Sequence, residues 1–469
     1  MMMRHAFLVF LPIAIAGVAL GADEGVTAAR YKATADKLID AALASQEGLD
    51  RFEYLCYRIG SRVSGSVALN TAITWSEAEM KKAGLSNVRT IPVKVPHWVR
   101  GAESAEMMEP LRKPLVMLGL GGSVGTAPEG ITADVVAVAN FDELEKLGRA
   151  GVEGKIVVYD APFVTYGQTV IYRGSGASRA ASLGAVAALV RSITPRSLRD
   201  AHTGAMNYNA EVAKIPAAAI SVEDAIYLHR LTQMGQRVRV HLSMEAHTEP
   251  DADSFDVMGE ITGSEKPDEV VVIGGHLDSW DVGQGAHDDG GGVMAALEAI
   301  SLMKKLGLHP RRTIRVVFWT NEENGGRGGA AYREWSQQQG MKHIAAIELD
   351  GGVESPVGFD LSLGGVRQQR GAAPAVRPPL SGAIYDRSVA IAQLLKRVNA
   401  TKVEQGNGES DIEPLMRDGV PGFGLRTVMT HYFDYHHTQA DTFDKIVPDE
   451  FRRCVAAMAV MSYALADWP

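Results

Sequence analysis

Histidine and acidic side chains recur at five separate places in the second half of the chain. His276 and Asp288 lie twelve residues apart, and the set continues with Glu322-Glu323, Asp350 and His437. Imidazole and carboxylate groups suit zinc, and no nearby thiol indicates a structural cysteine site. Gathered in a cleft without cations, four carboxylates would repel one another at a cost on the order of several kcal/mol. The set therefore predicts a site for two zinc ions.

Two neighbouring ions need a shared carboxylate and about two further protein ligands each. Asp288 is predicted to bridge the ions. His276 and Asp350 are predicted to bind one of them, and Glu323 and His437 the other. This arrangement leaves an open position for a water molecule, whose pKa zinc lowers to about 7.

Two further acidic residues have predicted roles beside the ligands. Glu322 is adjacent to a ligand without being needed as one, so it is predicted to take a proton from water and deliver it to a leaving amine. Asp278 follows His276 by two residues and is predicted to hold the second nitrogen of that imidazole, which is a common arrangement around metals.

Apolar runs precede three of these positions and predict buried strands. Residues 270–273 precede His276, residues 314–319 precede Glu322, and residues 344–349 precede Asp350. Helical stretches such as 292–300 separate the runs. The alternation predicts an α/β fold in which helices sandwich a mostly parallel mixed sheet, and ligands bind beyond the carboxyl ends of such strands.

Each motif also has a structural interpretation when taken alone. His276 could be an ordinary loop residue, residues 288–292 a polar turn, and Glu322-Glu323 a solvated pair on the surface. The combination on one predicted sheet edge favours metal binding, because chance clustering of this kind is improbable.

The motifs resemble those of the di-zinc exopeptidases, a family that includes bacterial aminopeptidases and glutamate carboxypeptidases. The resemblance rests on residues 275–285, 285–290, 322–323 and 436–442, with further matches at 96–101 and 119–131. It implies the zinc exopeptidase fold and the same ligands, with Glu322 as the acid and base. It also implies a cis peptide between Asp288 and Asp289. Asp289 is expected to lie behind the ligands and support them.

The residue before the last predicted ligand departs from the pattern of many relatives. These relatives have a tyrosine that supports the reaction intermediate, whereas this chain has His436. His436 is predicted to donate to the developing oxyanion, and packing beside the metal is an equal alternative. His287 is not assigned as a ligand, because Asp288 fills the motif position. Asp411 and Asp441 could support the ligands or cap helices.

Residues 1–21 are predicted to be a secretory signal peptide, since a basic start precedes a short apolar run and small residues. Residues 123–242 differ from their flanks and contain none of the ligands. They resemble a protease-associated domain inserted into the peptidase, which would divide the catalytic domain into residues 22–122 and 243–469. Such a domain could border the substrate cleft or only stabilise the chain.

Composition limits the remaining function classes. The 56 acidic and 47 basic residues are dispersed, which argues against nucleic acid as a partner. No later stretch is apolar enough for stable membrane insertion, so an exported protein, periplasmic or extracellular, is expected. Cys56 and Cys454 could pair or remain buried thiols. A homodimer is implied only by the resemblance.

Short peptides or dipeptides with free termini are the substrates that the resemblance implies, and an aminopeptidase acting on longer peptides is the alternative. A second alternative is an inactive binding protein on a peptidase scaffold, although all six predicted positions are filled. Residues 121–125 match the pattern of a serine hydrolase centred on Ser123, but residues 126–130 would break the helix that must follow. The preferred end of the peptide does not follow from the sequence.

Overall fold

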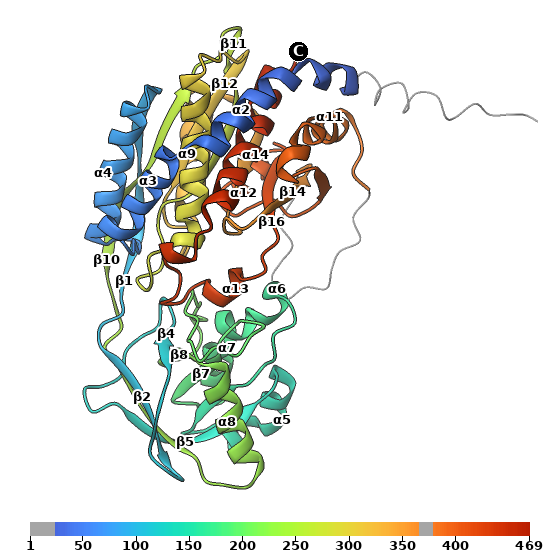
Figure 1. Cartoon of the computed structure of the whole chain (residues 1–469). Coiled ribbons are helices and arrows are strands. Elements are labelled where there is room, and N and C mark those ends of the chain that lie inside the picture. The colour runs from blue at the N-terminus through green and yellow to red at the C-terminus, as the bar shows by residue number, and fades with distance from the viewer. Residues whose placement is uncertain (1–23, 365–378) are drawn as a thin grey trace, which may run out of the picture.

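The computed structural model describes residues 24–364 and 379–469 and consists of two units, each built on an eight-stranded sheet (Figure 1). The predicted signal peptide lies outside the described residues. The long antiparallel strands β1 and β10 run from the first unit towards the second, so both units share one strand pair as their connection.

The first sheet has a parallel centre and antiparallel flanks. Strands β12, β11, β13 and β16 are parallel neighbours, whereas β1, β10 and β14 join through antiparallel pairs and β15 runs parallel to β14. In sheet order the strands are β1 (Ser86–Val99), β10 (His247–Ile261), β12 (Arg312–Trp319), β11 (Lys266–His276), β13 (Lys342–Glu348), β16 (Gly422–Thr427), β14 (Pro356–Ser362) and β15 (Lys402–Gln405). The predicted mixed α/β sheet is therefore present.

Helices cover both faces of this sheet, because its central strands bury alternate residues on opposite sides. Val271 and Ile273 of β11 belong to one hydrophobic cluster, whereas Val270 and Val272 belong to another. The first cluster packs α2 (Lys32–Ala44), α3 (Glu47–Tyr54), α4 (Val67–Lys82), α9 (Gly291–Lys305), α11 (Ala383–Ala392) and α14 (Pro448–Asp467). The second packs α10 (Arg327–Gln338) and α12 (Glu413–Arg417).

The second unit comprises residues 103–244. Its sheet runs β3 (Lys113–Leu115), β2 (Glu103–Glu109), β9 (Arg239–Met244), β5 (Ile131–Val138), β6 (Ile156–Tyr159), β7 (Ala187–Arg191), β8 (Ala217–Ile220) and β4 (Met117–Gly119). Around it lie α5 (Phe141–Val152), α6 (Tyr166–Thr169), α7 (Ile171–Ser182) and α8 (Val222–Gln233). The predicted boundary after residue 122 would cut this sheet, since β2 pairs with β9 and β4 pairs with β8. The second unit therefore begins about twenty residues earlier than the sequence predicted.

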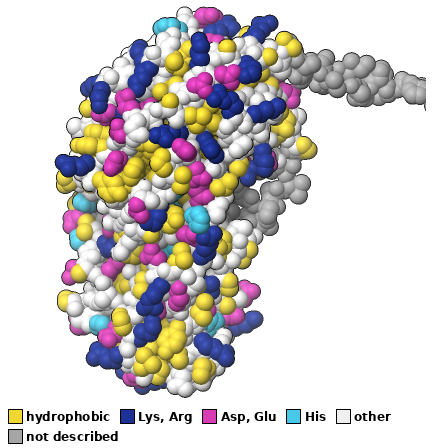
Figure 2. Space-filling model, in the orientation of Figure 1, with side chains coloured by type: hydrophobic (Ala, Val, Ile, Leu, Met, Phe, Trp, Pro, Cys, Tyr) yellow, Lys and Arg dark blue, Asp and Glu magenta, His cyan; other side chains and the backbone are white. Residues whose placement is uncertain are grey.

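The charged side chains and the two cysteines can be compared with what the sequence predicted. Figure 2 shows positive and negative side chains interspersed over both units on the visible face. Among helices in the described ranges, none combines the length and apolarity that a membrane crossing requires. Cys56 and Cys454 are both buried and free, so of the two predicted alternatives the thiol form is the one present.

Candidate metal centre

Three of the predicted ligand positions emerge at one edge of the first sheet. Strand β11 ends at His276, which lies level with Trp319 at the end of β12. Gly274 of the same strand pairs with Glu348, two residues before Asp350. Since β11, β12 and β13 are parallel, their carboxyl ends meet there, as predicted.

Asp288 lies between two groups of candidate ligands. One of its oxygens is 3.2 Å from His276 Nε2, and that nitrogen is 3.3 Å from Asp350 Oδ1. The other oxygen is 3.1 Å from His437 Nε2, and this nitrogen is 3.0 Å from Glu323 Oε2. The five predicted ligands thus converge, with the carboxylate of Asp288 facing both pairs.

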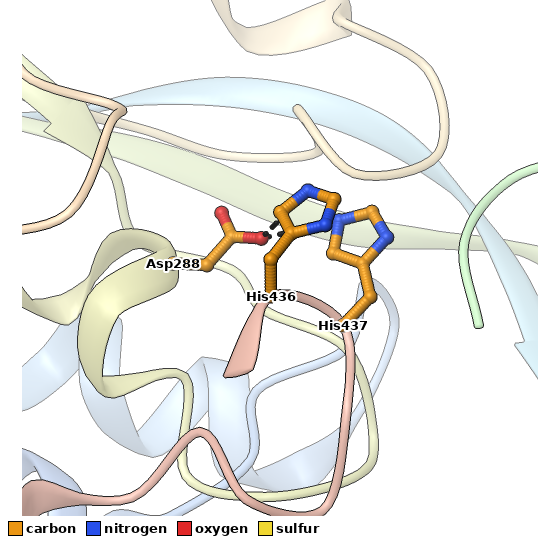
Figure 3. Close-up of side chains that lie close together, drawn as sticks. All are labelled: Asp288, His436 and His437. Carbon is orange, nitrogen blue, oxygen red and sulfur yellow. Dashed lines mark ion pairs between the residues drawn. The ribbon is translucent and has the colours of Figure 1, made fainter. Parts of the chain in front are cut away.

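His436 stacks on His437 with 3.6 Å between ring centroids (Figure 3). Both residues follow the short helix α13 (Tyr432–Tyr435). The Nε2 atom of His436 is 3.6 Å from Asp288 Oδ2, farther than that of His437. Of the two rings, His437 is the one that also approaches Glu323.

The electrostatics of this cluster fit a cation. Burial raises the pKa of Glu323 to about 8 and that of Asp350 to about 6. Burial by itself would lower the pKa of His437, but Glu323 and Asp288 outweigh it and raise the pKa well above its usual value. Glu323 Oε1 is buried with no hydrogen-bond partner among the described residues. Bound divalent cations would supply the missing partner and charge.

Acidic side chains behind the ligands hold the backbone around Asp288, which precedes α9 in the distorted turn η2 (Ala286–Gly290). Asp289 Oδ2 accepts a hydrogen bond from the His276 main-chain N–H at 3.1 Å, and the Asp288–Asp289 peptide is cis, as the resemblance implied. Asp441 accepts from the main-chain N–H groups of His287 and Asp288 at 2.7 and 3.2 Å. Of its two predicted roles, Asp441 therefore has the supporting one.

Asp278 supports the site in a different way from that predicted. The Nδ1 atom of His276 is 2.9 Å from the main-chain oxygen of Asp278 and 3.8 Å from its carboxylate. The carboxylate instead accepts hydrogen bonds from the main-chain N–H groups of Glu322 and Glu323, at 3.1 and 3.4 Å. The prediction that the Asp278 side chain orients the imidazole is thus wrong, because this carboxylate faces the main chain of the two glutamates that follow β12.

Sequence reasoning missed Arg62, which is fully buried beside this loop. Its guanidinium donates to the main-chain oxygens of Leu277, Gly60, Gln284 and Gly285, at 2.7, 2.7, 2.7 and 3.0 Å. These bonds tie the segment between His276 and Asp288 to the N-terminal part of the chain. Arg62 has no spacing relationship to the ligands, so no local pattern could have revealed it.

The structure also places His287, Asp411 and Ser123, for which the sequence left other roles open. The ring of His287 stacks on Tyr435, outside both groups of possible metal ligands found among the described residues. Asp411 does not cap α12, since Ile412 precedes that helix and neither carboxylate oxygen of Asp411 accepts a hydrogen bond. Ser123 is buried, and its hydroxyl donates to the Val124 oxygen and accepts from the Ala217 N–H. These bonds explain Ser123 as a structural residue.

A cleft of about 670 Å³ lies over the ligand cluster between the two units. Glu322 and Glu323 line it from the first unit, and Tyr166 and Arg173 line it from α6 and α7 of the second. Arg173 is buried, and its Nε atom has no hydrogen-bond partner in the described part of the chain. A volume of this size suits a small ligand.

The sequence of this chain matches a known peptidase family. Residues 256–462 match the model for peptidase family M28. Carboxypeptidase Q of Xenopus laevis is 44% identical over 440 residues, which cover 93% of this chain and 90% of that protein. Carboxypeptidase Q of Homo sapiens is 42% identical, covering 90% of this chain and 86% of that protein.

Solved structures agree with these matches. A peptidase M28 precursor from Shewanella amazonensis SB2B is 33% identical with a TM-score of 0.86, covering 94% of this chain and 97% of that one. A zinc aminopeptidase from Bacillus subtilis has a TM-score of 0.64 at 18% identity, covering 90% of this chain and 96% of that one, and it shows the shared fold.

Proposed function

Because the chain belongs to peptidase family M28 and is an enzyme of that family, we propose that it is a di-zinc exopeptidase hydrolysing short peptides or dipeptides with free termini. The observation that carries this proposal is the position of Asp288 between two pairs of candidate ligands. The name of the zinc aminopeptidase from Bacillus subtilis supports the choice of metal.

The contacts around Asp288 support the proposed ligand roles. Asp288 would bridge two zinc ions, with His276 and Asp350 on one side and Glu323 and His437 on the other. Bound zinc would polarise the scissile carbonyl and lower the pKa of water to about 7. The positive charge of two zinc ions would offset the repulsion among the carboxylates that are buried together here.

Glu322 is the proposed general base. Its main-chain N–H is held by Asp278 at 3.1 Å, while its side chain lines the cleft and is only partly buried. From this position the carboxylate would accept a proton from water and return it to the leaving amine. His436, at the wall of the cleft, would donate to the oxygen that becomes negative.

Arg173 supports a substrate with a free carboxylate. The cleft otherwise presents mainly acidic groups around the ligands, and the buried guanidinium of Arg173, whose Nη atoms donate to Thr203 and Tyr166, adds a positive charge at its wall. The second unit, which we propose is an inserted protease-associated domain, would thus bind one end of the peptide. We also propose that residues 1–21 direct export of the protein. We propose that the exported protein is a homodimer, and a sedimentation mass equal to one chain would refute the dimer.

Glu322→Gln tests the mechanism directly. The amide cannot accept the proton, so kcat on a free dipeptide should fall by about 10²- to 10⁴-fold while zinc content stays at two per chain. Glu334→Gln, at an exposed position of α10, is the matched control and should retain full activity. Full activity of Glu322→Gln would refute this mechanism.

Three alternative functions predict different results in assays of peptide hydrolysis. An aminopeptidase would cleave long peptides with a blocked carboxyl end as fast as free dipeptides. An inactive binding protein would hold zinc without hydrolysing any member of the panel. A serine hydrolase would lose activity in Ser123→Ala and keep it after chelation. Free, amidated and acetylated dipeptides assayed together therefore separate these functions.

A further inference from the structure

The loop between β7 and β8 of the second unit reaches the candidate metal centre through Thr203. The N–H of Thr203 donates to the main-chain oxygen of His437 at 3.0 Å. In the opposite direction, His437 Nδ1 lies 3.2 Å from the main-chain oxygen of Thr203. Thr203 and His437 are both buried, so neither bond competes directly with bulk water.

The Thr203 oxygen can accept a hydrogen from His437 Nδ1, whereas Arg173 Nη1, which lies 3.2 Å from the same nitrogen, can only donate. A hydrogen on Nδ1 that bonds to the Thr203 oxygen leaves the Nε2 lone pair directed at Asp288 and Glu323, as metal binding requires. The same oxygen accepts from Arg173 Nη1 at 2.9 Å. Both lone pairs of the Thr203 oxygen are therefore used to hold groups of the centre.

The backbone of His437 adds an independent observation. Its φ is +63°, in the left-handed region that residues other than glycine rarely adopt. A conformation of this kind persists where surrounding contacts outweigh its cost. The bond from the Thr203 N–H to the His437 oxygen is such a contact, and it comes from the second unit.

Thr203 is itself firmly anchored. Its hydroxyl donates to the Gly119 oxygen at the end of β4 at 2.7 Å, and the next residue, Gly204, accepts from the Gly121 N–H at 3.0 Å. Arg100 also donates to the Gly119 oxygen, at 2.6 Å, and pairs with Asp281 in the loop after β11. The anchor therefore connects to both units.

We propose that Thr203 is a positioning residue for the ligand His437, so that the second unit forms part of the metal centre. This inference rests on the proposed di-zinc site. Without the Thr203 contacts, the His437 ring and backbone would relax, and the zinc ion shared by His437 and Glu323 would bind more weakly. The ion held by His276 and Asp350 would stay bound, because those ligands come from the first unit alone.

Thr203→Pro in the full-length protein removes the donating N–H. Zinc affinity is measured by competition with a chromogenic chelator, and folding is checked by circular dichroism. We expect one of two ions to bind about 10- to 100-fold more weakly, which is the usual effect of losing a group that orients a ligand. Ser197→Pro, in an exposed part of the same loop, is the control and should bind both ions as the unchanged protein does.

If Thr203→Pro does not fold, a second pair of variants tests whether Thr203 positions His437. Thr203→Val removes the hydroxyl anchor and should weaken one ion several-fold, whereas Thr203→Ser keeps the hydroxyl and should restore binding. If every Thr203 variant that folds binds both ions as tightly as the unchanged protein does, the inference is overturned and the proposed function stays intact. Fewer than two ions in the unchanged protein would instead overturn the di-zinc proposal.

Discussion

Replacing Arg62 with methionine should destabilise the protein while preserving most of the side-chain volume. Arg62 is completely buried and donates four hydrogen bonds to main-chain oxygens. Methionine leaves these four carbonyls without their donor, at about 1 kcal/mol or more each. Removal of the buried charge offsets part of this loss. We therefore expect the free energy of unfolding to fall by about 3–4 kcal/mol.

Urea denaturation of the metal-free protein measures this change without a contribution from zinc binding. Arg58→Met is the matched control, since Arg58 lies in the neighbouring short helix η1 (Leu55–Ile59) and is exposed. Its effect should stay within about 0.5 kcal/mol. Because the Arg62 bonds hold the loop before Asp288, zinc affinity should fall as well. If Arg62→Met costs no more than Arg58→Met, the loop is held by other contacts and the reasoning is wrong.

Three further outcomes are expected. Burial lowers the pKa of His343 from 6.5 to about 3, so the folded protein excludes a proton that the unfolded chain binds, and stability falls as the pH drops from 6.5 towards 3. His343→Gln should flatten this slope in urea titrations at several pH values, and an unchanged slope would contradict the assignment. The buried thiols of Cys56 and Cys454 should react with a disulfide reagent only after denaturation, and reaction of the native protein would show that a thiol is accessible. Burial raises the pKa of Glu323 to about 8, so the metal-free protein should lose stability as the pH rises from 4.5 through 8. Zinc should therefore increase Tm more at pH 8 than at pH 6, and equal increases would argue against Glu323 as a ligand.

The amino-acid sequence by itself predicted the central sheet and the kind of chemistry. Apolar runs of strand length mark β11, β12 and β13, and a longer apolar stretch marks α9. Such runs depend on which residues are neighbours along the chain, so they can be read locally. Parallel strands then bring His276, Glu322 and Asp350 to one edge, because the direction of each strand determines where its end lies.

Only the tertiary structure decided how that site is supported. Arg62 and Thr203 reach the loops of the ligands from distant parts of the chain. The carboxylate of Asp278 holds the end of β12 instead of the imidazole. The second unit begins before the predicted boundary because β2 pairs with β9, more than a hundred residues later in the chain. Hydrogen bonds of this kind depend on where two remote backbones meet, and residue spacing along one segment carries no information about that meeting.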